Sequence, residues 1–222
     1  MNLRNTKNQP LSLKQFQVMD ALAVEKFKLP VELMMENAGL QLARRVSAKA
    51  LVEDIIVIGA GNGNNGGGGL VAARRLAGWG YSVFLDLPFN ITKELPQKQL
   101  QRALAFGAKT VPANAPAVWV DAYLGFSQRL PLSEPIKNSI QKANQSDAYR
   151  ISLDLPTGIS PNPDEVIFDA KEVLTLAAHK KILNHLPESV AIYIADIGLP
   201  AAVYKEFGLL QPEFNKDQII PL

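Results

Sequence analysis

A run of glycines and asparagines is the first feature of this sequence that could do chemistry. The segment GAGNGNNGGGG at 59–69 holds seven glycines and three asparagines, and it lies between the apolar run IIVIG at 55–59 and LVAARRLAGWG at 70–80. Glycine allows the backbone to approach a ligand closely, and the unpaired N–H groups at a helix start attract anions. The pattern favours a phosphate-bearing ligand, with a tight strand-to-helix connection as the structural alternative.

The glycine segment matches neither of the two common nucleotide-binding motifs. A Walker loop needs Gly-Lys-Ser/Thr after its glycines, whereas Gly69 is followed by Leu70. The opening of a Rossmann hydride-transfer site is closer, because GAGNG at 59–63 resembles it superficially and Asp86 lies at a suitable spacing for a ribose contact. The segment contains so many glycines that no single spacing of them matches the Rossmann motif distinctively. An NAD(P)-dependent oxidoreductase is therefore kept only as a weaker alternative.

Two carboxylates follow apolar runs further along the chain. Asp121 lies within AVWVDAYLG at 117–125, and Asp154 opens DLPTG at 154–158, directly after the run YRISL. Ligands of open α/β sheets bind beyond the carboxyl ends of the strands. We therefore expect both carboxylates and the glycine segment to meet at one edge of a sheet.

The elements that position these residues follow from the hydrophobic periodicity. Ser12 begins a helix expected from about 13 to 27, and Pro30 begins a second through PVELMMENAGLQLARRV. Short apolar runs then alternate with helical segments, which indicates parallel β-α units with helices on both faces of the sheet. The fold class is therefore α/β, a three-layer αβα Rossmann-like sandwich with a mostly parallel central sheet and two N-terminal helices. The expected strands are 55–59, 81–87, 117–125, 149–156, 171–177 and 189–196, and the later helices are QKQLQRALAFG, EPIKNSIQKAN and AAVYKEFG.

Composition excludes several classes of protein. The 222 residues are 47% hydrophobic and 20% charged, ordinary values for a globular chain, and one domain is the better expectation. A formal charge of +2 offers no broad electrostatic footprint for nucleic acid or an anionic membrane, so a small-molecule partner is favoured. The absence of cysteine excludes disulfides and thiolate metal sites. No apolar segment reaches the roughly 18 residues of a membrane span, and we expect a soluble cytoplasmic protein.

Four motifs together resemble one known family. GNGNNGGGGLVAARRL at 61–76 is similar to the GxGNNGGDGLVAARxL segment of YjeF N-terminal domains, the NAD(P)H-hydrate epimerases, also described in animals as apolipoprotein A-I-binding protein. LMMENAG at 33–39, VDAYLGFSQR at 120–129 and SLDLPTG at 152–158 resemble further family motifs in the same order, and TLAAHK at 175–180 is a looser fifth. The resemblance implies that residues 1–222 form a single YjeF N-terminal-type domain without a fused dehydratase domain.

The resemblance also implies the reaction. Members of the family interconvert the R and S epimers of hydrated NADH and NADPH, called NADHX and NADPHX, which carry a hydroxyl at C6 of the nicotinamide ring. Inversion at that carbon needs a proton donor and acceptor near the ring. Asp154 is the first catalytic candidate, and Lys180 is a weaker electrostatic or proton-transfer candidate. The structural alternatives are a loop cap for Asp154 and a solvated surface group for Lys180.

The family further implies a potassium ion and a substrate site. Asn65, Asp121 and Thr157 match the cation positions, although Thr157 replaces the usual Ser and these side chains could instead secure loops. Arg129 is a candidate for a diphosphate or for the extra phosphate of NADPHX. The substrate-binding candidates implied by the resemblance are Asn64, Asn65, Gly66, Gly67, Gly68, Gly125, Phe126, Ser127, Gln128, Arg129 and Asp154.

Gly68 is the main departure from the family pattern, which has Asp at this position. Loss of that carboxylate removes a charge and a hydrogen-bond acceptor from the substrate segment. A catalytically impaired nucleotide-binding or assembly module of the same fold is therefore the principal alternative to an active epimerase. We also expect a separate NAD(P)HX dehydratase as pathway partner, and apolar residues on the first two helices are compatible with a homodimer.

Overall fold

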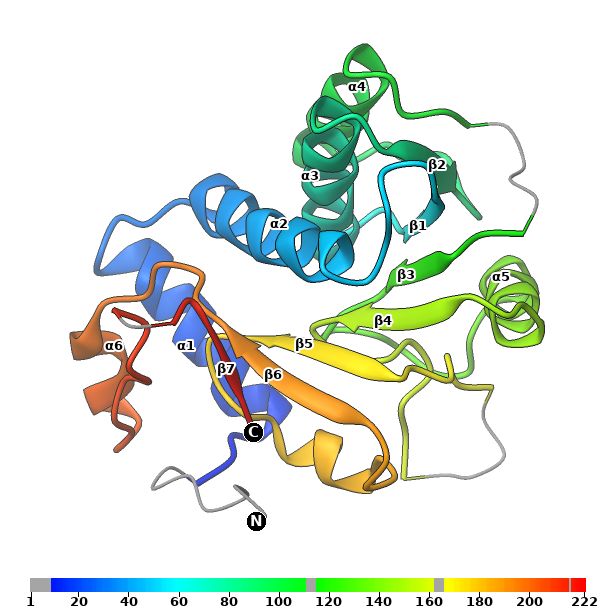
Figure 1. Ribbon diagram of the computed structural model, residues 1–222. Helices are drawn as coiled ribbons and strands as arrows, with labels where there is room; N and C mark the ends of the chain where they lie inside the picture. Colours follow the sequence, from blue (N-terminus) through cyan, green and yellow to red (C-terminus); the bar gives the residue numbers. More distant parts are fainter. Residues whose placement is uncertain (1–8, 111–114, 162–165, 216) are drawn as a thin grey trace.

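A seven-stranded sheet organises the chain. The computed structural model describes residues 9–110, 115–161, 166–215 and 217–222. The strand order is β2-β1-β3-β4-β5-β6-β7, and every neighbouring pair is parallel except β6 with β7 (Figure 1). The strands are β1 (Ile55–Ala60), β2 (Ser82–Asp86), β3 (Val118–Ala122), β4 (Tyr149–Leu153), β5 (Glu172–Leu176), β6 (Ala191–Ala195) and β7 (Ile219–Pro221).

Helices cover both faces of this sheet, which confirms the three-layer α/β prediction. On one face α2, α3 and α4 pack together, and α5 lies against the other (Figure 1). Alternation along β1 explains both contacts: Ile56 and Ile58 point into the core beneath α2 and α3, whereas Val57 belongs to the core beneath α5. The helices are α1 (Leu13–Glu25), α2 (Val31–Ser47), α3 (Asn64–Gly78), α4 (Glu94–Ala105), α5 (Glu134–Gln145), α6 (Ala201–Glu206) and the 3₁₀ helix η1 (Lys181–His185).

The two N-terminal helices form where they were predicted. The Ser12 hydroxyl accepts the N–H of Gln15, and the Gln15 side chain accepts the N–H of Ser12, so a complete capping box begins α1. This helix ends at Glu25, two residues before the predicted end. Met19 and Ala23 are fully buried in a third apolar cluster that includes Val203 of α6. The cluster fixes α1 beside the carboxyl end of the sheet.

The glycine segment differs from its prediction as a loop. Helix α3 begins at Asn64, so the four glycines at 66–69 lie inside its first turns. Their packing explains the residue type: a Cβ on Gly66 would overlap with the carbonyl of Gly61, and one on Gly67 would lie 2.6 Å from the Met35 sulfur. The glycines thus let α3 approach both the end of β1 and α2.

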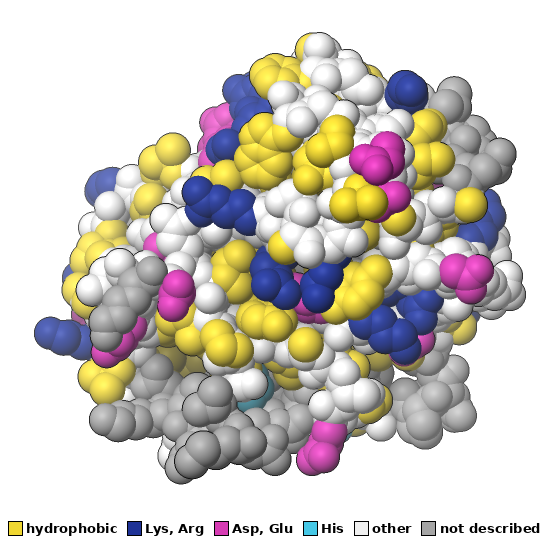
Figure 2. Space-filling model, viewed as in Figure 1, with side chains coloured by type: hydrophobic (Ala, Val, Ile, Leu, Met, Phe, Trp, Pro, Cys, Tyr) yellow, Lys and Arg dark blue, Asp and Glu magenta, His cyan; other side chains and the backbone are white. Residues whose placement is uncertain are grey.

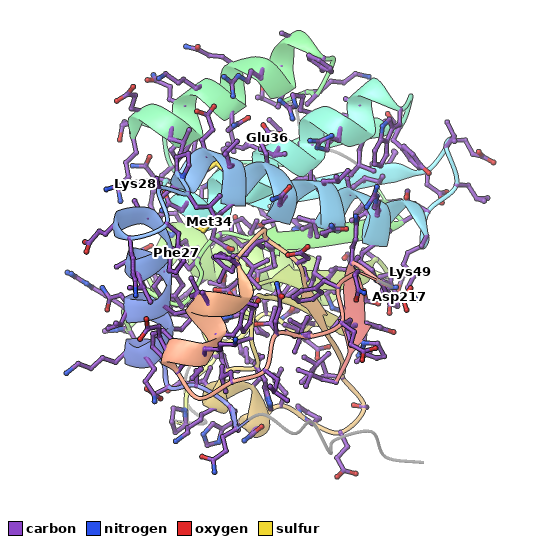
Figure 3. The ribbon with its side chains drawn as sticks, turned by 90° about the vertical axis from the view of Figure 1, so that its left-hand side faces the viewer. Phe27, Lys28, Met34, Glu36, Lys49 and Asp217 are labelled. Atoms are coloured by element: carbon purple, nitrogen blue, oxygen red, sulfur yellow. The ribbon has the colours of Figure 1, made fainter. Side chains whose placement is uncertain are left out.

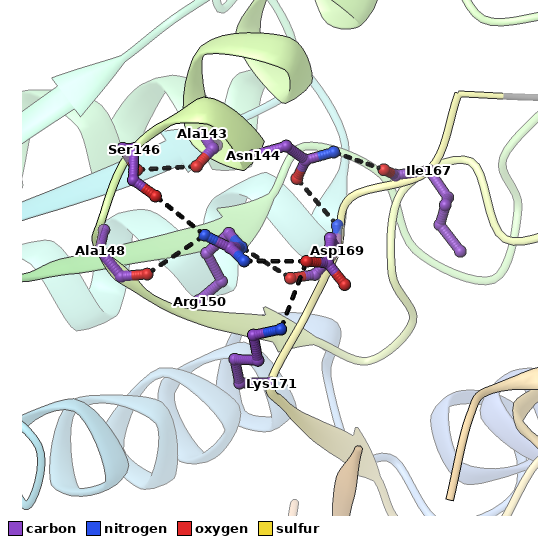
Figure 4. Close-up of polar contacts among 8 residues, drawn as sticks. All are labelled: Ala143, Asn144, Ser146, Ala148, Arg150, Ile167, Asp169 and Lys171. Carbon is purple, nitrogen blue, oxygen red and sulfur yellow. Dashed lines mark hydrogen bonds and ion pairs between the residues drawn. The ribbon is translucent and has the colours of Figure 1, made fainter. Parts of the chain in front are cut away.

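The start of β4 carries a structural arginine. The Arg150 guanidinium donates to the Asp169 carbonyl (2.7 Å), to the Asp169 carboxylate (2.8 Å) and to the Ser146 carbonyl after α5 (3.0 Å), as Figure 4 shows. These bonds join the chain entering β4 to the chain entering β5. Strand β4 therefore has a tightly bonded beginning, whereas its carboxyl end leads to Asp154.

Strand β7 and η1 were not predicted, because each is only a few residues long and lacks a clear period. In the described part of the chain, no helix is long and apolar enough to cross a bilayer. Figure 2 shows basic, acidic and apolar side chains interspersed over the face that it presents, in keeping with the formal charge of +2.

Candidate functional site

A cavity of about 220 Å³ opens at the carboxyl end of the sheet. Its walls come from α1, α2, the start of α3, the segment after β3 and the end of β4. Strand β1 lies between β2 and β3, so the chain passes to opposite sides of β1 at this point, where ligands of open α/β sheets bind. The predicted residues that line the cavity are Asn64, Asn65, Gly68, Gly125, Phe126, Ser127, Gln128 and Asp154.

Asp154 and Lys180 form a buried ion pair at the cavity. Lys180 Nζ lies 2.8 Å from Asp154 Oδ1, and the two side chains are 0% and 2% exposed. Lys180 is therefore not a solvated surface group, which was the alternative to a role in the site. Burial lowers its pKa, which the charge of Asp154 opposes. The two opposite charges therefore lie in direct contact inside the protein.

The ammonium of Lys180 is held mainly by neutral acceptors. It donates to Thr175 Oγ1 and to the Leu176 carbonyl, each at 2.9 Å, and the ring centroid of Phe16 lies 3.7 Å from Nζ. Asp154 Oδ1 receives no well-aligned hydrogen bond from any residue that the structure describes, despite its closeness to Nζ. This oxygen is buried against Nζ, so the ammonium is its closest partner.

The backbone of Asp154 explains how its carboxylate reaches the cavity. Its φ of 69° is left-handed, an uncommon conformation that Asp tolerates better than most residues. Its N–H donates to the Leu174 carbonyl of β5 (2.8 Å), and its Oδ2 accepts the Phe126 N–H (3.1 Å). The side chain is thereby fixed between the ends of β4 and β3. Backbone strain of this kind is common at functional sites.

Asp121 is the second predicted carboxylate, and it bonds to strand β4 and to the segments that follow β3 and β4. Its oxygens accept hydrogen bonds from the Thr157 hydroxyl (2.6 Å), the Thr157 N–H (2.7 Å), the Ser152 hydroxyl (2.9 Å) and the Tyr123 N–H (3.2 Å). Burial raises the pKa of Asp121 to about 6, against the lowering effect of these donors. The carboxylate therefore has a structural role at the carboxyl ends of β3 and β4.

Asn65 lies beside this network at the start of α3. Its amide nitrogen donates to the Leu124 carbonyl (3.0 Å) and to the Leu153 carbonyl (3.2 Å). Its Oδ1 is buried and has no hydrogen-bond partner among the described residues. Thr157 also donates to Asp121 and lies within 3.5 Å of the Leu124 carbonyl. The three predicted cation residues therefore share one neighbourhood, with one unused amide oxygen in it.

The atoms that Asn65, Asp121 and Thr157 could offer to an ion are all oxygens. An amide oxygen without a partner, a hydroxyl and a carboxylate suit a hard cation. The four donors already on Asp121 leave Asn65 Oδ1 as the readily available ligand. In the described residues, no cluster of three or more His, Cys, Asp or Glu side chains could hold a metal ion. The donor set thus fits a weakly held monovalent ion better than a divalent one.

Comparison with known proteins identifies the family. Residues 31–182, which contain the glycine segment, Asp121, Asp154 and Lys180, match the family described as YjeF-related protein N-terminus. The chain belongs to this family. The crystal structure of yeast ynu0 has a TM-score of 0.83 at 24% sequence identity, covering 97% of this chain and 100% of that one, and it shares the fold.

Two curated relatives have names that describe a reaction. A bifunctional NAD(P)H-hydrate repair enzyme of Archaeoglobus fulgidus is 33% identical over 86% of this chain, which spans 42% of that enzyme's length. An NAD(P)H-hydrate epimerase of Rhodopirellula baltica is 30% identical over 90% of this chain and 88% of its own length.

Several residues of the YjeF-type pattern lie outside the cavity lining. Gly66 and Gly67 permit close packing at the start of α3, as described above. Arg129 is exposed, and its contact with a ligand phosphate stays a prediction. Gln128 lines the cavity and also accepts the Gly158 N–H (2.7 Å), so it secures the DLPTG turn.

Gly68, the departure from the YjeF pattern, lies in the cavity wall. It sits inside a helix, where its backbone is accessible to any L-residue. A Cβ here would lie 3.0 Å from a Leu153 methyl and 3.9 Å from the Cβ of Ala38. Aspartate is therefore conformationally possible at this position, at the expense of a small shift of Leu153.

Sequence reasoning missed the part of the cavity that comes from the first two helices. Phe16 and Asp20 of α1 and Val31, Met34 and Met35 of α2 all line it. Figure 3 shows Met34 and Glu36 on opposite sides of α2, and Glu36 pairs with Arg74 and Arg75 of α3 instead. The spacing of Asp20, four residues after Phe16, could have identified it, because this spacing places its carboxyl on the buried side of an amphipathic helix.

The oxidoreductase alternative loses its main support within this YjeF-type fold. Tyr123 fills the space over Gly59 and Gly61, where an added Cβ would overlap with its ring or backbone. Its hydroxyl donates to Asp86 Oδ2 at 2.6 Å. Both features that suggested a Rossmann fingerprint, the glycines and Asp86, are therefore engaged by one tyrosine.

Proposed function

We propose that this protein is an NAD(P)H-hydrate epimerase, which interconverts the R and S epimers of NADHX and NADPHX. The Rhodopirellula relative is named for this activity and aligns with most of the chain. The observation that carries the proposal is Asp154, a carboxylate paired with the buried Lys180 and facing a cavity that begins at a glycine-rich helix start.

The cavity suits each part of such a substrate. Gly63 caps α3 without a side-chain hydrogen bond, so the first N–H groups of the helix are available to phosphate. Lys93, which also lines the cavity, adds a positive charge. At the other end Asp154 and the apolar side chains of Phe16, Met34 and Leu176 form a pocket for the nicotinamide ring. We place the ring beside Asp154 and the diphosphate near α3.

The chemistry assigned to Asp154 is proton acceptance. Inversion at C6 requires its hydroxyl to leave and return, or the ring to open and close, and either route needs a base. The Asp154 carboxyl contacts the Lys180 ammonium through Oδ1 and the Phe126 N–H through Oδ2, and the residue lines the cavity. Lys180 places a positive charge directly beside the proposed base.

We also propose a potassium ion held by Asn65, Asp121 and Thr157. Support comes from the unpartnered Oδ1 of Asn65 and from the convergence of the three residues. A bound ion would supply fixed positive charge at the edge of the site. A homodimer, a cytoplasmic location and a separate dehydratase partner remain predictions.

A coupled assay tests the proposal. A mixture of R- and S-NADHX is incubated with a dehydratase specific for the S form, which consumes only that epimer. Addition of this protein should then drive consumption of the R form above the rate without enzyme. Saturable dinucleotide binding without turnover would favour the nucleotide-binding module. Oxidation of NADH coupled to a carbonyl substrate would favour the oxidoreductase.

A further inference from the structure

A second carboxyl group faces the cavity, and the function proposed so far does not use it. Asp20 of α1 lines the same cavity as Asp154. No hydrogen bond or ion pair reaches its side chain from any residue that the structure describes. A half-buried carboxyl without a partner brings no evident stability to the fold, because desolvating it is unfavourable and no bond offsets that cost.

The charges around Asp20 make it different from Asp154. Burial raises the pKa of Asp20 above its ordinary value, and the negative charge of Asp154 adds to this effect. The positive charge of Lys180 lowers the pKa of Asp20, but its ammonium pairs with Asp154, at 2.8 Å, and not with Asp20. Two carboxyls in one cavity thus have unequal surroundings, one with a cation beside it and one without. Such inequality is how proteins separate an acid from a base.

We propose that Asp20 is a catalytic residue of the epimerase, the proton donor that complements the proton acceptor Asp154. This inference rests on the proposed function. Asp20 approaches the cavity from α1, whereas Asp154 approaches it from the end of β4, so the two groups belong to different walls. Asp20 can then protonate the hydroxyl that leaves one face of the ring. Asp154 can accept the proton of the water that adds at the other face.

The step balances without any further reactant. The C6–O bond breaks with its electron pair on oxygen, the ring-nitrogen lone pair forms a double bond to C6, and the Asp20 proton converts the leaving hydroxyl to water. Water then adds to C6 from the opposite face, its oxygen pair forms the new C–O bond, and the nitrogen regains its lone pair. Asp154 takes the proton of that water. Asp154 then releases its proton to solvent and Asp20 takes one up, so both groups return to their starting states, and nothing is oxidised or reduced.

The first test compares Asp20→Asn with Glu25→Gln. Glu25 lies on the same helix, is exposed, and matches the loss of one carboxylate. Asp20→Asn should lower kcat for R-NADHX epimerisation about 10²- to 10⁴-fold, the usual value of a positioned proton donor. Dinucleotide affinity should be unchanged, because the amide keeps the shape of the carboxyl. Glu25→Gln should behave as wild type, and Asp20→Glu should restore part of the rate.

The pH profile separates a proton donor from a structural residue. Wild-type activity should fall as pH rises through the pKa of Asp20, because only the protonated form donates. This fall should be absent from the residual activity of Asp20→Asn. Asp154 and Lys180 are the charged groups that act on Asp20, and both are retained in this variant.

Thermal unfolding gives a readout independent of turnover. Since the folded pKa of Asp20 is raised, the folded chain binds this proton more tightly than the unfolded chain, and ionisation lowers stability as pH rises through the folded pKa. Asp20→Asn should therefore unfold at a higher temperature than wild type at neutral pH. The difference should vanish below pH 3.8.

Three outcomes would overturn the inference. An Asp20→Asn protein with wild-type kcat and pH profile would dismiss Asp20 and leave the epimerase intact. A variant that loses activity, affinity and thermal stability together would make Asp20 structural. Wild type and Glu25→Gln that both bind dinucleotide without epimerising it would remove the proposed function, and the role of Asp20 with it.

Discussion

Two buried ion pairs lie at opposite ends of the sheet, and their geometries differ. Glu172 begins β5, is 1% exposed, and accepts two bonds of 2.7 Å from Nε and an η nitrogen of Arg45 on α2. Tyr149 Oη adds a third contact at 3.3 Å. At the carboxyl end, Asp154 has the single ammonium of Lys180 beside one oxygen and a backbone N–H on the other.

The difference separates a pair that joins elements from one that does chemistry. A bidentate guanidinium satisfies both carboxylate oxygens and fixes α2 against β5, and the hydrogen bond to Glu172 raises the pKa of Arg45. Lysine is a point charge whose pKa burial lowers, and it leaves Asp154 Oδ1 unbonded at a cavity. Satisfied pairs therefore mark the amino end of this sheet as structural, and the unsatisfied pair marks the other as the site.

The largest expected effect is the loss of catalysis at the unsatisfied pair. Asp154→Asn removes the proton acceptor, and we expect kcat in the coupled R-NADHX assay to fall about 10²- to 10⁴-fold. Lys180 loses the charge that raises its pKa, so its ammonium should deprotonate more readily. Dinucleotide binding, measured by titration, should survive. A variant with unchanged kcat would show that the two pairs do not differ in function.

Breaking the satisfied pair should affect stability and spare chemistry. Arg45→Met leaves the buried Glu172 with only the Tyr149 hydroxyl (3.3 Å) and the more distant Lys49 ammonium (3.9 Å). The loss of unfolding free energy should therefore stay below the value of about 3–5 kcal/mol that is typical of a buried charge left with no partner. The folded fraction should retain wild-type kcat. Arg44→Met, an exposed change on the same helix that removes hydrogen bonds to Gln41 and Gln218 but no ion pair, is the control and should cost only about 0.5–1.5 kcal/mol. The double variant Arg45→Met, Glu172→Gln should recover part of the loss in denaturant titrations, and its failure to do so would weaken the comparison.

The regular helices and strands were easier to predict from sequence than the cavity between them. The apolar run IIVIG predicts its strand from local sequence alone, and the capping box of Ser12 and Gln15 predicts the start of α1. The family motifs include Asp154 and Asn65, and both residues line the cavity. Asp20 was not predicted as a cavity residue, because its helix lies far along the chain from the strands that it packs beside. Contacts between distant segments, such as the bridge of Leu11 to Lys180, depend on packing that no local pattern encodes.

Asp121 offers an intermediate case, structural in its bonds and adjacent to the site. Asp121→Asn replaces one acceptor oxygen by an N–H₂ group that must face donors from Thr157 or Ser152. We expect a loss of about 1–3 kcal/mol in unfolding free energy. Wild-type crystals soaked in rubidium should show anomalous density beside Asn65, and this density should be absent from the variant. A lysine ammonium in that position would contradict the cation proposal.

Gly68 gives the smallest and most informative change, because it adds a carboxylate to the wall of the cavity. Gly68→Asp should raise kcat for R-NADHX about tenfold, as one added charged hydrogen bond of about 1.5 kcal/mol would do. The helical backbone accepts aspartate, and the contact of its Cβ with Leu153, at 3.0 Å, offsets the gain of about 0.5–1 kcal/mol that removing a helix glycine brings. Stability should therefore change little.

Gly68→Ala separates the carboxylate from the helix effect, since it adds the same Cβ without charge. Its kcat should equal that of wild type. An equal rise in both variants would assign the gain to a stiffer α3. If wild type and Gly68→Asp bind dinucleotide yet neither turns it over, the cavity is a binding site. Asp154 would then be an ion pair of the same structural kind as Glu172, despite its unbonded oxygen.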